Sequence, residues 1–126
     1  GALYTCGMFA WAGNATSPGG FHRIRRGAQP AQVPLAVKAA KGEMKVTFSD
    51  PIDRIDCVMK VWSLKRTKNY GSKHHDEHEL TIRGVKLSED KKTITLDIPD
   101  LAPTWCYELK IGDRVLHGTI HQLAKP

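Results

Sequence analysis

The 126-residue chain has little of what would identify an enzyme. It has no G-x-S-x-G, no H-E-x-x-H and no glycine-rich phosphate loop between a strand and a helix. It has three cysteines, with no C-x-x-C spacing, which excludes the local signals of a zinc ribbon, a thioredoxin-like site and covalent haem attachment. Cys6, Cys57 and Cys106 allow at most one internal disulfide, and we expect buried free thiols. These absences favour a protein that is not an enzyme.

Long apolar runs are also missing. The longest spans only a few residues, whereas a transmembrane helix needs about 20, so we expect no membrane span. The start, Gly1-Ala2-Leu3, lacks the charged and apolar regions of a signal peptide. Because the chain opens on glycine and runs directly into a strand-like stretch, we expect it to be a piece of a longer protein.

The net charge is +6, from 19 basic and 13 acidic residues. The basic residues are scattered apart from short groups at 22–26 and 65–68, and aromatic residues do not alternate with them. Proteins that bind single-stranded nucleic acid combine a basic groove with stacking aromatics. A solvated basic surface is therefore favoured, and nucleic acid is not an expected partner.

The apolar pattern predicts a protein built from strands. Residues 1–27 form two strand-like stretches around a loop of turn formers, which predicts a β-hairpin, and residues 28–34 carry two prolines and are a predicted linker. A lone hairpin is marginal in water, so we expect this one to pack on the domain that follows or on a neighbour. Residues 35–124 alternate strands with turns and contain no convincing helix, which predicts an immunoglobulin/fibronectin III-like β-sandwich of about seven strands.

Three local patterns support the sandwich. Apolar residues alternate with polar ones at 44–48 and 93–98, as in half-buried strands, and residues 79–87 are predicted as a single strand. Gly112-Asp113 predicts a tight turn between the last two strands. The spacing of Leu101, Pro103 and Tyr107 resembles the tyrosine corner of fibronectin III domains, which implies a hydrogen bond from the Tyr107 hydroxyl to upstream backbone.

The stretch from 65 to 80 concentrates imidazole and carboxylate groups. His74, His75 and His78, with acidic neighbours, are ligands suited to zinc or copper, and a loop could bring the three histidines around one ion. The competing interpretation, a histidine-rich solvated loop, is favoured because no helix or rigid turn is evident there. His117 and His121 lie about 13 Å apart along a strand, too far to share an ion, and are expected at the surface.

Two aromatics flank the same stretch. If Trp62 points away from the core, it and Tyr70 could form a platform for a sugar ring, as in a carbohydrate-binding module. The residues available to hydrogen-bond that sugar are Lys65, Arg66, Asn69 and His74. The favoured alternative is that Trp62 packs in the core from a central strand.

Three stretches together resemble one kind of segment: LYTCGMFAWAGNATSPGGFHRIRR, VWSLKRTKNYGSKHHDE and LSEDKKTITLDIPDLAPTWCYELKI. This combination is similar to the region of large extracytoplasmic proteins of planctomycetes and related bacteria that joins a sorbosone- or glucose-dehydrogenase-like β-propeller to a haem c domain. The resemblance implies that residues 1–27 are the closing strands of the last propeller blade and that the sandwich is an accessory domain appended to it.

The same resemblance implies a periplasmic or secreted location and neighbouring domains of the parent protein as partners, with polysaccharide as a further one. Haem c and a quinone cofactor would belong to the parent, because this segment lacks C-x-x-C-H and most of a propeller, so none is expected here. The sequence therefore predicts a non-catalytic accessory domain of a cytochrome-linked, sugar-dehydrogenase-like protein. A carbohydrate-binding module and a metal-binding domain are the alternatives.

Overall fold

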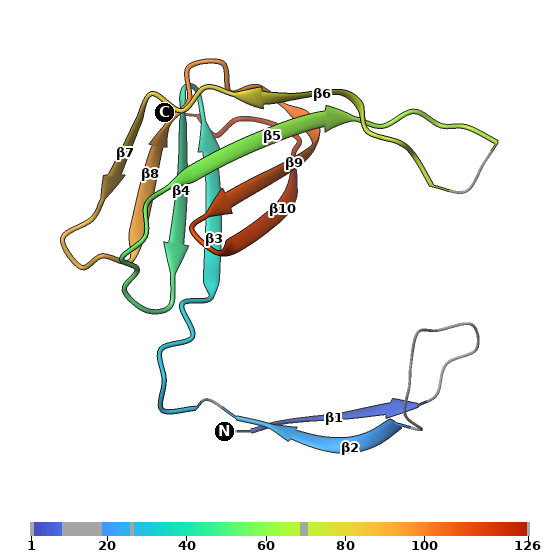
Figure 1. Ribbon diagram of the computed structural model, residues 1–126, viewed down its shortest axis with the longest axis vertical. Helices are drawn as coiled ribbons and strands as arrows, with labels where there is room; N and C mark the ends of the chain where they lie inside the picture. Colours follow the sequence, from blue (N-terminus) through green and yellow to red (C-terminus); the bar gives the residue numbers. More distant parts are fainter. Residues whose placement is uncertain (1, 9–18, 26, 69–70, 126) are drawn as a thin grey trace. The chain divides into compact units, whose positions relative to one another are not determined.

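The computed structural model describes residues 2–8, 19–25, 27–68 and 71–125 (Figure 1). The chain divides into two units, Gly1–Pro30 and Ala31–Pro126. Every helix or strand element among the described residues is a strand, and the paired strands are antiparallel, so the predicted all-β class is confirmed. No described segment forms a helix that could cross a membrane.

The first unit is the predicted hairpin. Strand β1 (Leu3–Met8) pairs with β2 (Gly19–Ile24), with Leu3 opposite Ile24. The rings of Tyr4 and Phe21 stack with their centroids 5.6 Å apart. Among the described residues of this unit, four large apolar side chains are exposed: Leu3, Tyr4, Phe21 and Ile24.

The second unit is a sandwich of eight strands. These are β3 (Pro34–Ala40), β4 (Glu43–Phe48), β5 (Cys57–Ser63), β6 (His75–Leu80), β7 (Gly84–Leu87), β8 (Thr93–Asp97), β9 (Thr104–Ile111) and β10 (Arg114–Ile120). They form two four-stranded sheets in the orders β3-β4-β8-β7 and β10-β9-β5-β6, seen as two layers in Figure 1. In immunoglobulin lettering the first sheet is A-B-E-D and the second G-F-C with an added C′ strand, so the predicted sandwich is confirmed.

The additional strand comes from residues 79–87, whose prediction as one strand is wrong. Leu80 ends β6 in one sheet and Gly84 begins β7 in the other. Leu80 and Val85 both pack against the core, each from its own sheet, so the chain must cross between the sheets at residues 81–83. The Arg83 amide donates to the Asp97 carbonyl at 2.9 Å and fixes the new strand beside β8.

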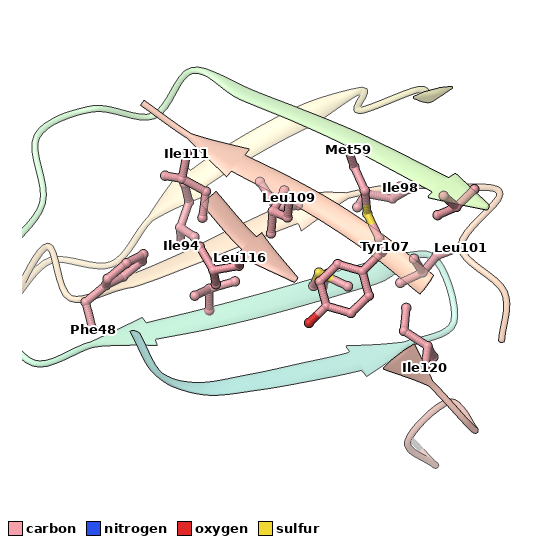
Figure 2. Packing of buried hydrophobic residues seen from close by; sticks show 14 of the residues in the cluster. Phe48, Met59, Ile94, Ile98, Leu101, Tyr107, Leu109, Ile111, Leu116 and Ile120 are labelled. Atoms are coloured by element: carbon pink, nitrogen blue, oxygen red, sulfur yellow. The ribbon is translucent and has the colours of Figure 1, made fainter. Parts of the chain in front are cut away.

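The core lies between the two sheets (Figure 2). The predicted alternation is confirmed, because β4 and β8 point their apolar residues inward and their pairs place Met44 beside Leu96 and Val46 beside Ile94. The opposite sheet contributes a matching set from β5, β9 and β10: Met59, Val61, Tyr107, Leu109, Ile111 and Leu116. Burying one such side chain stabilises the fold by about 1.5–3 kcal/mol, so this cluster determines which face of each strand is inside.

Contacts with other parts of the sandwich fix the chain at both ends of β3. At its start, the backbone amides of Ala31 and Gln32 each donate to the Asp50 carboxylate at 3.2 Å, so residues 31–34 of the predicted linker belong to the sandwich. At its end, Ala124 bridges to Ala40 in parallel, and its amide donates to the Ala39 carbonyl at 2.8 Å.

The predicted turn at Gly112-Asp113 is confirmed, because Ile111 pairs with Arg114 and Gly112 has a φ of 59°. That positive φ at the first turn residue is the one a type II′ hairpin turn requires.

Tyr107 is buried as expected of a structural residue, but its contacts differ from those of a tyrosine corner. Its hydroxyl lies over Gly118 of β10, where a Cβ atom would meet it at 2.6 Å. Among the described residues this hydroxyl makes no hydrogen bond to upstream backbone, so that expectation is not met. Burial raises the pKa of Tyr107.

All three cysteines are free, as expected. Their predicted burial is wrong for Cys6, which is exposed on the hairpin, whereas Cys57 and Cys106 are half-buried. Burial, followed by the neighbouring Asp56 carboxylate, raises the pKa of Cys57 to about 11.

Candidate functional site

Of the residues predicted for a site, Trp62 lies on the solvent-facing side of the β10-β9-β5-β6 sheet. Met59 and Val61 occupy the inward positions of β5, so the alternation of the strand turns Lys60 and Trp62 outward. The expectation that Trp62 packs in the core is therefore wrong. Trp62 is half-buried on the outer face, beside Cys106 of β9.

A row of ionisable side chains crosses this face. The register places Lys60 opposite both Glu108 and Glu79, and His117 opposite Glu108. The Lys60 ammonium lies 3.9 Å from the Glu79 carboxylate and 3.8 Å from that of Glu77, and His117 Nε2 lies 3.8 Å from Glu108 Oε2. Such exposed pairs add little to the stability of the fold, because water screens them. These pairs make the outer face of the sheet polar. His117 lies at the surface, as predicted.

Trp62 is covered by a histidine. The rings of Trp62 and His74 are stacked, with centroids 4.1 Å apart and planes inclined by 15°. His74 Nδ1 is hydrogen-bonded to the Glu77 carboxylate, which lowers the pKa of Glu77. A sugar ring would have to displace this imidazole before it could stack on that face of Trp62. Tyr70, the other predicted platform residue, and Asn69, one of the predicted hydrogen-bonding residues, lie outside the described residues.

The connection between β5 and β6 is strongly basic. Its described residues extend beyond the end of both sheets (Figure 1). Four cationic side chains on it are exposed: Lys65, Arg66, Lys68 and Lys73. The Lys65 amide donates to Ser72 Oγ at 3.2 Å and joins its two arms. We call residues 64–68 and 71–74 the basic connection.

The three histidines predicted as metal ligands occupy different settings. His75 and His78 lie in β6 rather than in a loop, with His75 opposite Ser63. His78 Nδ1 bonds to the Asp76 carbonyl at 2.8 Å, and His74 is engaged by Glu77. Over the described ranges, no three histidine, cysteine or acidic side chains are grouped so as to hold a metal ion.

One exposed aromatic was missed from the sequence. Trp105 is 65% exposed, although simple alternation along β9 puts it on the same side as the buried Tyr107. Trp105 points to the other side of the sheet because the pairing of β9 with β10 is irregular there. No local pattern in the sequence indicates this irregularity. A shallow hollow of about 220 Å³ lies beside the indole.

Comparison of the chain with protein-family models, curated proteins and solved structures finds no match in any of the three.

Proposed function

We propose that the chain is a non-catalytic accessory domain of a larger extracytoplasmic, cytochrome-linked, sugar-dehydrogenase-like protein, and that the sandwich holds a neighbouring domain of that protein. The observation that carries this proposal is the basic connection, which extends from the sandwich with four exposed cations. Clustered cations steer and orient an acidic partner surface more than they add affinity. An acidic face of a neighbouring domain is the partner that this charge suits.

The base of the basic connection is held in place, which suits a docking role. The Trp62–His74 stack and the hydrogen bond from His74 to Glu77 attach its second arm to the sheet face. The Lys65–Ser72 hydrogen bond attaches the first arm to the second. An attached loop loses less conformational freedom on binding than a free one, so more of its interaction energy remains as affinity.

The hairpin supports a multidomain parent. Two strands alone are marginally stable in water, and this hairpin by itself leaves Leu3 and Phe21 more than half exposed. A further sheet or domain would cover these side chains. The closing strands of a propeller blade, as the resemblance implies, would be covered in this way.

Cross-linking of the parent protein tests the proposal. A zero-length carbodiimide joins lysines to carboxylates in contact, and we expect Lys65, Lys68 and Lys73 to link to acidic residues outside 31–126. Lys38 and Lys41, which are exposed at the β3–β4 hairpin, are the matched controls and should give few such links. A coding sequence with no further domain on either side, or links from the controls in equal yield, would contradict the proposal.

A further inference from the structure

The pairing of β9 with β10 is irregular at Trp105. Regular pairing stops on either side of the irregularity, at the pairs Tyr107–Gly118 and Thr104–Ile120. Between those pairs, Trp105 and Cys106 together face the single residue Thr119. Two residues opposite one form a β-bulge, which breaks the alternation of a strand and re-aims side chains, often beside functional sites.

The bulge exposes the indole and is itself fixed. Trp105 is 65% exposed, whereas Tyr107, two residues further along β9, is 6% exposed. The Thr119 hydroxyl donates to the Trp105 carbonyl at 2.8 Å and holds the bulged backbone. Trp62 is covered by His74, but Trp105 has no stacked ring partner within the part of the chain that the structure describes.

The hollow beside the indole is small, and three of the residues at its rim are polar: Thr104, Thr119 and His121. Its lining residues are Pro103, Thr104, Trp105, Thr119, Ile120 and His121. At about 220 Å³ it is smaller than the roughly 300–1,000 Å³ of pockets for drug-sized ligands, so it suits a single ring. None of these residues is acidic or carries a lysine or arginine cation, so the hollow suits a neutral ligand.

The rim offers hydrogen bonds of the kind that a polyol uses. Thr119 donates its proton to the Trp105 carbonyl, and Thr104 donates its own to the Cys106 carbonyl at 3.2 Å, so both hydroxyl oxygens keep lone pairs that can accept. The exposed ring of His121 can donate from one nitrogen and accept at the other. An apolar flat face beside such a rim matches a pyranose, which has a face of C–H groups and an edge of hydroxyls.

We propose that Trp105 is the platform of a carbohydrate site that binds a pyranose unit of a neutral polysaccharide. The sugar stacks on the exposed indole, and its hydroxyls bond to Thr104, Thr119 and His121. This site differs from the Trp62 platform expected from the sequence, and it does not rest on the proposed role of the basic connection.

Affinity electrophoresis of the 126-residue chain tests the proposal, run toward the cathode because the net charge is +6. The gels contain hydroxyethylcellulose, xylan or galactomannan as neutral probes and polygalacturonate as an acidic one. We expect retardation in at least one neutral gel, weakened at least tenfold in affinity by Trp105→Ala and only partly by Trp105→Phe. Phe21→Ala, which removes another exposed aromatic, and Trp62→Ala should leave the retardation unchanged.

Each other result overturns the proposal. No retardation in any neutral gel does so, as does retardation that Trp105→Ala leaves intact. If only polygalacturonate retards the protein and salt abolishes that retardation, the effect is due to net charge. Self-association in sedimentation that disappears with Trp105→Ala, without binding to a neutral glycan, assigns the indole to a protein interface.

Discussion

The hairpin and the sandwich differ in how far they shield their apolar side chains from water. In the sandwich, two facing sheets enclose a cluster in which residues such as Phe48 are 1% exposed. In the hairpin, a single two-stranded layer leaves Phe21 76% exposed, with Tyr4 stacked beside it. A β structure is stable on its own when a second layer covers its apolar face. Strands and apolar residues alone are not enough.

The largest expected difference between the two units is in the free energy of unfolding. Phe48→Ala removes a fully buried ring and should lower that free energy by about 3–5 kcal/mol, because a cavity is left behind. Phe21→Ala should change it by less than about 0.5 kcal/mol, because an exposed side chain is lost. Urea titration of both variants measures this, and equal losses would show that the hairpin shares the core of the sandwich.

A second contrast lies in thiol reactivity. With a pKa of about 11, Cys57 is only about 0.1% thiolate at pH 8, so we expect it to react on the order of 100-fold more slowly than the exposed Cys6. Its rate should rise about tenfold per pH unit up to pH 11, because the raised pKa keeps the thiol protonated below that value.

Iodoacetamide labelling followed by mass spectrometry checks this on two variants. Cys57→Ser with Cys106→Ser leaves only Cys6, and Cys6→Ser with Cys106→Ser leaves only Cys57. Similar rates at pH 8 would show that the burial of Cys57 is lost in solution.

The smallest contrast concerns two strand glycines. Gly118→Ala puts a Cβ atom 2.6–2.7 Å from the hydroxyl and ring of Tyr107, and we expect it to destabilise the sandwich by about 1–3 kcal/mol. Gly7→Ala in the hairpin meets nothing within 4 Å and should be nearly neutral. Thermal unfolding by circular dichroism separates the two, and a neutral Gly118→Ala would show that Tyr107 can move aside.

Local patterns predicted those parts of the fold that depend on one strand at a time. The alternation of Met44, Val46 and Phe48 needs only one buried face, and it is found in the structure. The stretch 79–87 resembles one strand in sequence, because nothing within it shows that Leu80 and Val85 pair in different sheets.

The candidate site was harder to predict for the same reason. Strand β5 is apolar on both faces, so its sequence does not indicate on which side Trp62 lies. Trp105 is exposed because β9 has one more residue than β10 between the pairs that flank the bulge. This is a property of the two strands together, which the sequence of β9 alone does not reveal. The Trp62–His74 stack likewise joins two ends of a connection whose path the sequence does not specify.

The two attachments of β3 give the sandwich a mechanical property. The chain enters where the Asp50 carboxylate binds the amides of residues 31 and 32, and it leaves where Ala124 bridges to Ala40. These points lie at opposite ends of a seven-residue strand, about 20 Å apart at 3.3 Å per residue. A pull between the two attachments would therefore run along β3, perpendicular to its hydrogen bonds to β4.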